Sequence, residues 1–217
     1  MENDRSDAPA RGTLRERKNA AAKRAFFKAA AALFREKGYD ATSVDEIAER
    51  AGYSRATFFN HFGAKESVLS YYFQFFGRRV EEILDQLDPR GSPLDRIHQM
   101  LAAMVGEAER QREDLKLVYM YRGKDPNYLD DVEQSRRGVL RRMTGLVDEA
   151  QRCGQMRRDL SAKELAYHIL SVHLGFMAAV ILTEIPSDQA LRSGWPFILN
   201  GARGSGAVGA SKTPGAT

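Results

Sequence analysis

Residues 42–62 read TSVDEIAERAGYSRATFFNHF, and this stretch decides the fold. Ser43 and Glu46 within it have the three-residue spacing of a capping box. In that motif the serine hydroxyl accepts a hydrogen bond from the backbone N–H of the third helical residue, and the carboxylate of that residue reaches back to the cap. The pair therefore predicts a short helix over residues 44–51.

A second short helix follows almost at once. Gly52 allows a tight turn, and Ser54 can cap a helix over residues 55–62. Two short capped helices around a glycine-containing turn are typical of a helix-turn-helix. The stretch therefore predicts an element that can enter a groove of DNA.

The first turns of that second helix carry side chains suited to reading base edges. Arg55 can bond guanine in a bidentate way, and Asn60 can do so with adenine. Ala56 or Thr57 can contact a thymine methyl group. These residue types predict direct contacts with bases.

Outward from this stretch, apolar residues recur at three- and four-residue spacing, and no run of strict alternation predicts a strand. The sequence therefore predicts an all-α fold. We expect helices over residues 15–37, 44–51, 55–62, 65–87, 94–108, 115–122, 132–150, 161–184 and 187–202. Pro196 lies inside the last of these and should kink or split it.

Positive charge is concentrated near the amino end. The 217 residues include 33 Lys and Arg against 29 Asp and Glu, a net charge of +4. Seven positive charges between residues 11 and 28 meet Glu16 alone; they are Arg11, Arg15, Arg17, Lys18, Lys23, Arg24 and Lys28. This excess permits nucleic-acid binding, and it favours residues 11–18 as a basic arm on phosphate or in a minor groove.

No arrangement of residues predicts an enzyme. The single cysteine, Cys153, excludes a disulfide framework within one chain and a thiolate zinc cage. His168 and His173 are five residues apart, whereas two metal ligands on one helical face need four. Residues 204–209 fit a dinucleotide fingerprint literally, but no strand precedes them and no helix follows. We therefore expect no catalytic residue, no metal site and no cofactor.

The segment from Leu165 to Thr183 has two interpretations. It runs for 19 residues without a formally charged side chain, which is close to the length that spans a bilayer. Polar residues within it, including Tyr167 and His173, instead favour a buried interface helix. The polar start of the chain predicts no secretory signal, so we expect a cytoplasmic protein without membrane contact.

Residues 34–39 and 42–69 together resemble the DNA-binding domain of the tetracycline-repressor (TetR) family of bacterial transcription regulators. We expect four segments in the chain, the last of them from its Gly-, Ala- and Ser-rich composition. They are a flexible arm at residues 1–14, a helix-turn-helix domain at 15–63, a helical effector-binding and dimerisation domain at 64–203, and a disordered tail at 204–217.

The same resemblance assigns two sets of DNA-binding residues. Those on the DNA-facing side of the recognition helix are Arg55, Ala56, Thr57, Phe59 and Asn60. Those that hold the phosphate backbone are Thr42, Ser43, Ser54, His61 and Lys65. For Ser43 and Ser54 the alternative is a role as helix caps only, and Phe58 and Phe62 are expected in the core.

The carboxyl-terminal half is expected, by resemblance, to form the dimer and to hold a ligand. The predicted interface residues, on the last two long helices, are Val172, Gly175, Phe176, Ala179, Leu182, Trp195 and Ile198. The candidate ligand-binding residues, which mix aromatic bulk with polar tips, are Met104, Tyr119, Tyr121, Met143, Tyr167, His168 and Phe176. The alternative for each of these is packing within the monomer.

The sequence thus predicts a DNA-binding transcriptional regulator, and the resemblance implies a homodimeric repressor. The free dimer would occupy a palindromic operator, and a small apolar or aromatic effector would select a conformer with low affinity for DNA. The alternative is a dimeric activator, or a regulator controlled by a protein partner without a small-molecule effector.

Overall fold

The computed structural model describes residues 13–124, 126, 128–183 and 185–203. All regular elements in these ranges are helical, which confirms the all-α prediction. They are α1 (Leu14–Lys37), α2 (Val44–Ala51), α3 (Arg55–His61), α4 (Ser67–Asp85), α5 (Pro93–Arg110), α6 (Arg112–Tyr121), the 3-10 turn η1 (Arg122–Lys124), α7 (Tyr128–Arg152), α8 (Ala162–Leu182) and α9 (Ser187–Ala202).

The two predicted terminal segments fall mainly outside the described ranges. Residues 1–12 of the arm, including Arg11, and residues 204–217 of the tail are not described. Thr13 and Leu14 belong to α1, because the Thr13 hydroxyl accepts a hydrogen bond from the backbone N–H of Glu16 at 3.3 Å and so caps the helix.

The chain divides into two compact units. The first comprises residues 1–73 and 117–131, and the second comprises residues 74–116 and 132–217. The division falls inside α4, α6 and α7, whereas a boundary was expected at residue 63. The end of α6 joins the first unit because the Tyr121 ring packs against Phe34 and Tyr39, with centroids 5.9 and 5.3 Å away.

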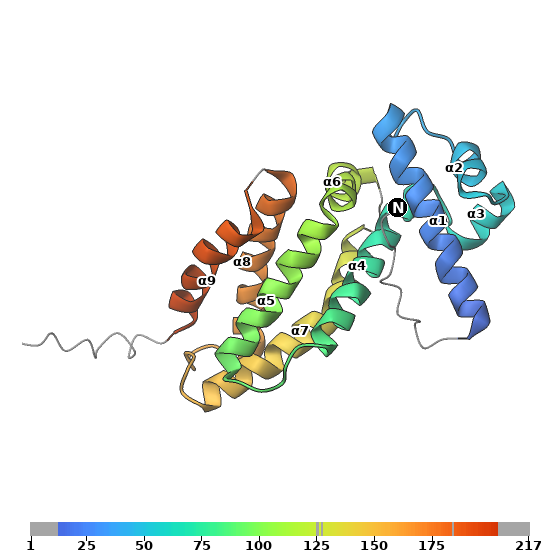
Figure 1. Cartoon of the computed structure of the whole chain (residues 1–217). Coiled ribbons are helices and arrows are strands. Elements are labelled where there is room, and N and C mark those ends of the chain that lie inside the picture. Colours follow the sequence, from blue (N-terminus) through green and yellow to red (C-terminus); the bar gives the residue numbers. More distant parts are fainter. Residues whose placement is uncertain (1–12, 125, 127, 184, 204–217) are drawn as a thin grey trace, which may run out of the picture. The chain divides into compact units, whose positions relative to one another are not determined.

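The first unit is built on an aromatic core. Phe26 of α1, Ile47 of α2 and Phe58 of α3 are fully buried, and the Phe26 and Phe58 rings meet edge to face at 5.3 Å. These contacts hold α2 and α3 against the long α1 (Figure 1). Burial of their apolar faces fixes the two short helices, which are too short to be stable alone.

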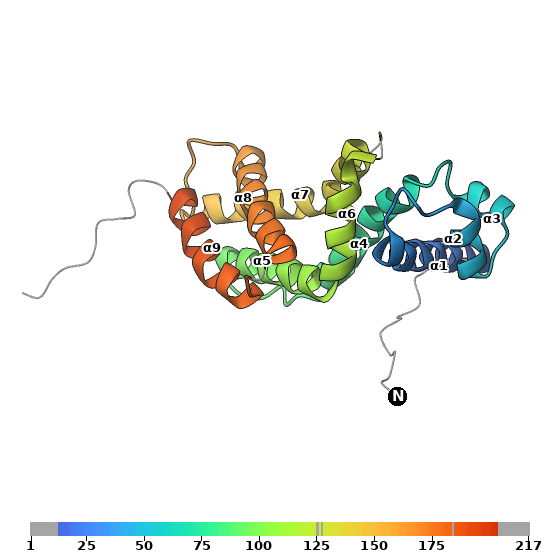
Figure 2. The ribbon, with the colours of Figure 1, turned by 90° about the horizontal axis from the view of Figure 1, so that it is seen from above.

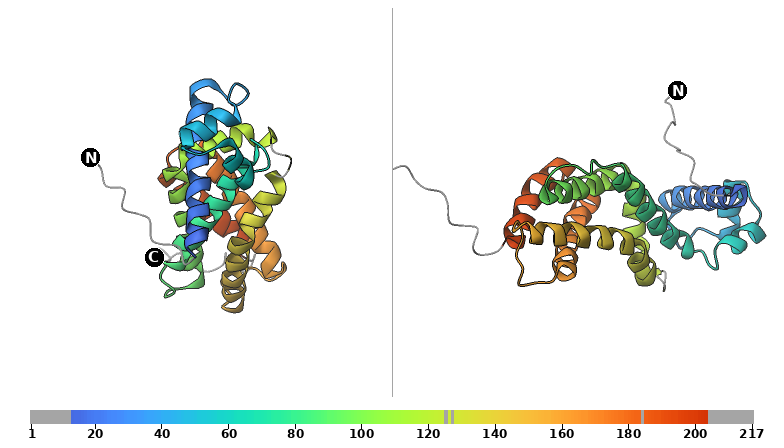
Figure 3. Two further views of the ribbon diagram at one scale, coloured as in Figure 1. Left: turned by 90° about the vertical axis from the view of Figure 1, so that its right-hand side faces the viewer. Right: turned by 90° about the horizontal axis from the view of Figure 1, so that it is seen from below.

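The second unit contains a layer in which α5, α8 and α9 pack against one another (Figures 2 and 3). Its buried side chains include Ile97 of α5, Val180 of α8 and Ile198 of α9. Met143 and Val147 of α7 are also fully buried. Helices of this unit therefore share a core that is separate from that of the first unit.

The apolar segment expected near residues 165–183 is α8. By length and composition it could cross a membrane, with a mean hydropathy of 1.9 over its most apolar window. One face of α8, including Leu165, Ile169 and Val180, is buried, and the helix packs on α5 and α9. That burial is what a core helix of a folded domain shows.

Pro196 does not split the last helix. α9 is continuous from Ser187 to Ala202, although proline has no N–H to donate to the carbonyl of Arg192. Both residues are exposed, so water can bond the orphaned carbonyl. The helix therefore does not split at Pro196, because the carbonyl that loses its partner faces solvent, and a kink there stays a prediction.

Candidate nucleic-acid interface

The capping box at the start of α2 is present. The Ser43 hydroxyl accepts from the Glu46 N–H at 3.3 Å, and the Glu46 carboxylate accepts from the Ser43 N–H at 2.9 Å. Lys37 adds an ion pair to Glu46. Hydrogen bonds from Lys37 and then from Ser43 lower the pKa of Glu46 to about 2. The carboxylate is therefore ionised at any physiological pH, and the cap is stable.

The turn between α2 and α3 has the predicted geometry. Gly52 is in the left-handed region with φ of 77°, and its N–H donates to the carbonyl of Glu49 at 3.0 Å. The Ser54 hydroxyl then accepts from the Thr57 N–H at 3.1 Å and starts α3. Ser43 and Ser54 are both caps, and a second role for either on phosphate stays a prediction.

The predicted base-reading residues lie mainly on one exposed face of α3. Arg55, Ala56 and Asn60 are exposed, and Phe59 keeps 43% of its surface accessible. Thr57 is half-buried, with its hydroxyl 2.9 Å from that of Ser54. The structure therefore brings four of the five side chains to the solvent side of the helix.

The opposite face of α3 is the core of the unit. Phe58 and Phe62 are buried, as expected, and their rings lie 5.3 Å apart. Tyr53, which the sequence analysis did not single out, is exposed and packs against Phe26 at 5.1 Å. Aromatic packing on the buried side of α3 thus holds its polar side chains at the surface.

Arg55 has a partner that sequence reasoning missed. Its Nη1 lies 2.5 Å from Oδ2 of Asp45 in α2, and its guanidinium carbon lies 5.3 Å from the centre of the Phe59 ring. The side chains of Arg55 and Asp45 are 59% and 62% exposed. Their separation of ten residues gives no periodic signal, because the pair forms across the turn.

Two residues assigned to phosphate contacts instead close the turn between α1 and α2. Thr42 is 2% exposed, and its hydroxyl donates to the carbonyl of Gly38 at 2.8 Å. Lys65 Nζ donates to the carbonyls of Tyr39 and Thr42, each at 2.8 Å. Partial burial is the main cause that lowers the pKa of Lys65. Contacts of either residue with DNA stay predictions.

His61 is half-buried at the end of α3, with its ring centroid 6.0 Å from that of Phe26. Burial and then the charge of Lys23 lower the pKa of His61. The imidazole is therefore mainly neutral at neutral pH. A contact between His61 and DNA phosphate stays a prediction.

The structure does not gather the seven candidate ligand-binding residues into one site. Tyr119 and Tyr121 belong to the first unit, and the other five belong to the second. Met104 and Met143 are buried in the core, whereas Tyr167 and His168 are exposed and Phe176 is half-buried. These seven residues were chosen from the sequence by residue type alone. In the folded protein they pack in different places and do not line one site.

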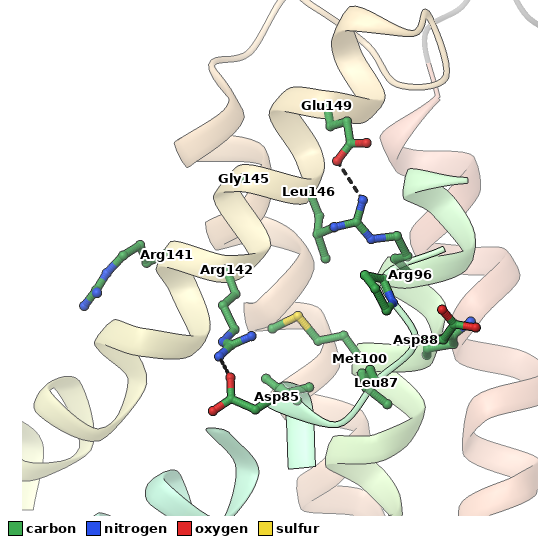
Figure 4. Close-up of a pocket in the computed structure, with 13 residues that line it drawn as sticks. Asp85, Leu87, Asp88, Arg96, Met100, Arg141, Arg142, Gly145, Leu146 and Glu149 are labelled. Carbon is green, nitrogen blue, oxygen red and sulfur yellow. Dashed lines mark hydrogen bonds and ion pairs between the residues drawn. The ribbon is translucent and has the colours of Figure 1, made fainter. Parts of the chain in front are cut away.

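A cavity of about 530 Å³ lies in the second unit between the end of α4, α5 and α7 (Figure 4). Its apolar lining includes Leu84, Leu87, Met100 and Leu146. Charged pairs cross it: Arg96 of α5 binds Glu149 of α7 at 2.9 Å, and Arg142 of α7 binds Asp85 of α4. None of the residues that line this cavity was predicted from the sequence to bind a ligand.

A much smaller cavity, of about 10 Å³, lies between α5, α8 and α9. Phe176 lines it, together with Trp195 and the buried His173. The space is that of roughly one water molecule. Phe176 is thus the one candidate ligand residue that lines either of these two cavities.

The predicted dimer residues differ in exposure. Val172, Gly175 and Leu182 of α8 are exposed, Phe176, Ala179 and Trp195 are half-buried, and Ile198 is buried. Phe197 of α9, not named from the sequence, keeps 65% of its surface accessible. Exposed apolar side chains on both helices are available to a partner surface.

These features define the first unit as a helix-turn-helix DNA-binding unit, in which two capped helices present an exposed polar face. Residues 26–72 match the sequence model described as bacterial regulatory proteins, tetR family. Residues 26–72 thus carry the DNA-binding segment of the tetR family, and the relatives that follow are transcriptional regulators.

The chain is 27% identical over 190 residues to the HTH-type transcriptional repressor BepR of Brucella suis biovar 1 (strain 1330), covering 82% of this chain and 86% of that protein. A TetR/AcrR-family regulator from Thermobifida fusca YX-ER1 has a similar structure, with a TM-score of 0.62, 25% identity and coverage of 83% and 98%. FadR of Thermus thermophilus, a TetR-family repressor solved with lauroyl-CoA, has a TM-score of 0.60, 22% identity and coverage of 89% and 100%.

Proposed function

We propose that this regulator is a ligand-responsive repressor that binds a palindromic operator as a homodimer in the cytoplasm. The exposed face of α3 carries the proposal. It presents Arg55, Ala56, Phe59 and Asn60 to solvent on a helix fixed from behind by Phe58. Such a helix can enter the major groove, where Arg55 and Asn60 meet base edges.

Dimerisation sets the length of the DNA sequence that the protein recognises. One recognition helix contacts only a few base pairs, so two copies related by a two-fold axis read two half-sites. The apolar side chains of Val172, Leu182 and Phe197 on α8 and α9 support these helices as the interface. Gly175 is exposed with open space around it, so a partner backbone can approach there.

The 530 Å³ cavity supports an effector site in the second unit. Its volume lies within the range of small-molecule pockets, and its lining combines apolar side chains with a few charged groups. The similar FadR was solved with lauroyl-CoA, a ligand with a long apolar chain. A small effector with an apolar or aromatic body is therefore the proposed class.

A repressor requires that effector and DNA weaken each other's binding. α4 is a single helix that contributes residues to both units, and its end carries Leu84 and Asp85 in the lining of the cavity. A ligand that separates Asp85 from Arg142 would therefore act on a helix that continues into the DNA-binding unit. The relative BepR, named as a repressor, favours this sign of regulation over activation.

Transcription in vitro tests the proposal. The template carries a promoter overlapping a duplex sequence that the protein selects, and a matched template carries the same bases scrambled. We expect the protein to lower transcription from the first template alone, and we expect lauroyl-CoA or one of a panel of apolar acids and aromatic compounds to restore it. An increase in transcription would contradict repression and support the activator. Repression that no compound in the panel relieves would count against the effector.

A further inference from the structure

Asp45 places a carboxylate beside the principal base-reading side chain. We propose that Asp45 is a specificity-determining positioning residue, which holds the Arg55 guanidinium in one orientation toward its base and lowers binding to unrelated DNA. This inference rests on the proposed function of α3 as the recognition helix. It goes further because it assigns a role to a residue that lies in α2.

The geometry confines the guanidinium on two sides. Asp45 is the second residue of α2 and Arg55 is the first of α3, and their Oδ2 and Nη1 atoms are 2.5 Å apart. The ring of Phe59 lies on another side, 5.3 Å from the guanidinium carbon. A long side chain that is otherwise free to change rotamer is thereby restricted before DNA binds.

The pairing leaves Arg55 able to read a base. A guanidinium has five N–H donors, and Nη1 of Arg55 donates to Asp45. The remaining donors can still reach the two acceptors that guanine presents in the major groove. Asp45 therefore orients the Arg55 guanidinium and leaves it enough free N–H donors to bond a base.

The carboxylate also acts against indiscriminate binding. Affinity for DNA of any sequence comes mainly from positive charges near phosphates, and a negative charge on the same surface opposes it. An exposed ion pair adds little to the stability of a fold. Asp45 also lies in the first turn of α2, where a carboxylate stabilises the helix, so unfolding of the variants is measured beside DNA binding to separate the two effects.

Glu49 offers a matched control on the same helix. It is exposed, and it forms no ion pair within the described part of the chain. Glu49→Gln removes one negative charge from α2, as Asp45→Asn does, without touching Arg55. A general charge effect raises affinity for unrelated DNA in both variants alike, whereas a positioning effect changes discrimination between bases in the Asp45 variant alone.

The experiment measures the affinity of the full-length protein, at one salt concentration, for three duplexes. These are the selected palindrome, the same palindrome with the base pair read by Arg55 replaced, and an unrelated sequence. That base pair is the position at which Arg55→Ala loses discrimination. Thermal unfolding of each variant is recorded so that misfolded protein is excluded, and Asp45→Glu tests rescue by a retained carboxylate.

We expect Asp45→Asn to raise affinity for the unrelated duplex and to reduce discrimination at the Arg55 position by about three- to tenfold, part of what a bidentate arginine supplies. Glu49→Gln should leave discrimination unchanged, and Asp45→Glu should retain it. In the Arg55→Ala background, Asp45→Asn should change no base preference, because the group that it positions is gone.

Two failures can be told apart. If the wild-type protein discriminates and Arg55→Ala does not, yet Asp45→Asn matches Glu49→Gln, the role of Asp45 is overturned while the recognition helix stands. If the folded wild-type protein shows no preference among the three duplexes, the assignment of α3 as the recognition helix is contradicted, and so is the proposed role of Asp45.

Discussion

The ammonium of Lys65 lies 4.1 Å from the centre of the Tyr39 ring and donates to the carbonyl oxygen of the same residue at 2.8 Å. A second hydrogen bond of the same length reaches the carbonyl of Thr42. Lys65, beyond the end of α3, thus fixes the turn that delivers Ser43 to the start of α2. One side chain ties together the segments on either side of the helix-turn-helix.

This relationship predicts a stability effect for Lys65→Ala. Removing a charged donor from two partly buried carbonyls should lower the free energy of unfolding by about 2 kcal/mol. Urea denaturation measures this loss, with Lys28→Ala as the control, since Lys28 is exposed on α1. Equal midpoints for wild type and Lys65→Ala would show that the bonds to the turn carry no stability.

The same variant tests the predicted phosphate contact. If Lys65 also binds phosphate, Lys65→Ala should weaken binding to all duplexes and flatten the dependence of log affinity on log salt by about one unit. The measurement is a series of binding curves at increasing salt. A slope equal to that of the wild type would assign Lys65 to the turn alone.

His173 should make the protein sensitive to acid. Burial lowers its pKa to about 4, and its Nε2 has no hydrogen-bond partner among the residues that the structure describes. As pH falls below 6.5 the unfolded chain binds a proton that the folded chain excludes, so stability is lost progressively down to pH 4. The loss should approach roughly 3 kcal/mol.

Comparison of variants isolates this effect. His173→Leu should flatten the stability profile between pH 6.5 and 4.5, where Glu46, with its pKa of about 2, remains ionised. His61 also has a lowered pKa and contributes to the wild-type slope, so the difference between profiles is the relevant quantity. His168→Leu, at an exposed site on α8, is the control. Parallel profiles for wild type and His173→Leu would refute the assignment.

The proposed interface predicts that Phe197→Ser weakens the dimer. If Phe197 is one of the few residues that dominate the interface, its loss costs about 2 kcal/mol, and the dissociation constant should rise by about 30-fold. Sedimentation equilibrium measures it. Met120→Ser removes a similarly exposed apolar side chain from α6 and should leave the dimer unchanged. Unaltered dimerisation of Phe197→Ser would exclude that residue from the interface.

Two glycines should respond oppositely to alanine. A Cβ at Gly194 of α9 would lie 3.0 Å from the ring of Phe176, whereas one at Gly145 of α7 would meet nothing within 4 Å. Gly145→Ala should stabilise the protein by about 0.5–1 kcal/mol through helix propensity. Gly194→Ala should destabilise it by about 1 kcal/mol, because overpacking outweighs that gain. Thermal unfolding that shows the same sign for both would contradict the packing of α8 on α9.

The sequence predicted the helix-turn-helix well because its signals are local. The capping box of Ser43 and Glu46, the turn at Gly52 and the cap at Ser54 each involve neighbours within a few residues. The exposed positions on α3 follow from helical periodicity once Phe58 is placed inside. Such features survive folding because tertiary packing does not have to create them.

Tertiary packing accounts for what the sequence did not predict. The Asp45–Arg55 pair and the bonds of Lys65 to carbonyls join segments whose separation carries no periodic signal. Aromatic residues such as Tyr121 suggested a pocket wall, yet its ring packs on Phe34 in the DNA-binding unit. The larger cavity lies elsewhere, between α4, α5 and α7, and Met100 is part of its lining.

The central claim is that a dimer of this protein reads DNA through α3. The most direct test selects duplexes from a random pool with the purified protein at a fixed, moderate salt concentration and sequences those retained. We predict a two-fold palindrome whose half-site preference weakens at one position for Arg55→Ala. A folded, dimeric protein that enriches no sequence, in the presence or absence of lauroyl-CoA, would contradict the claim.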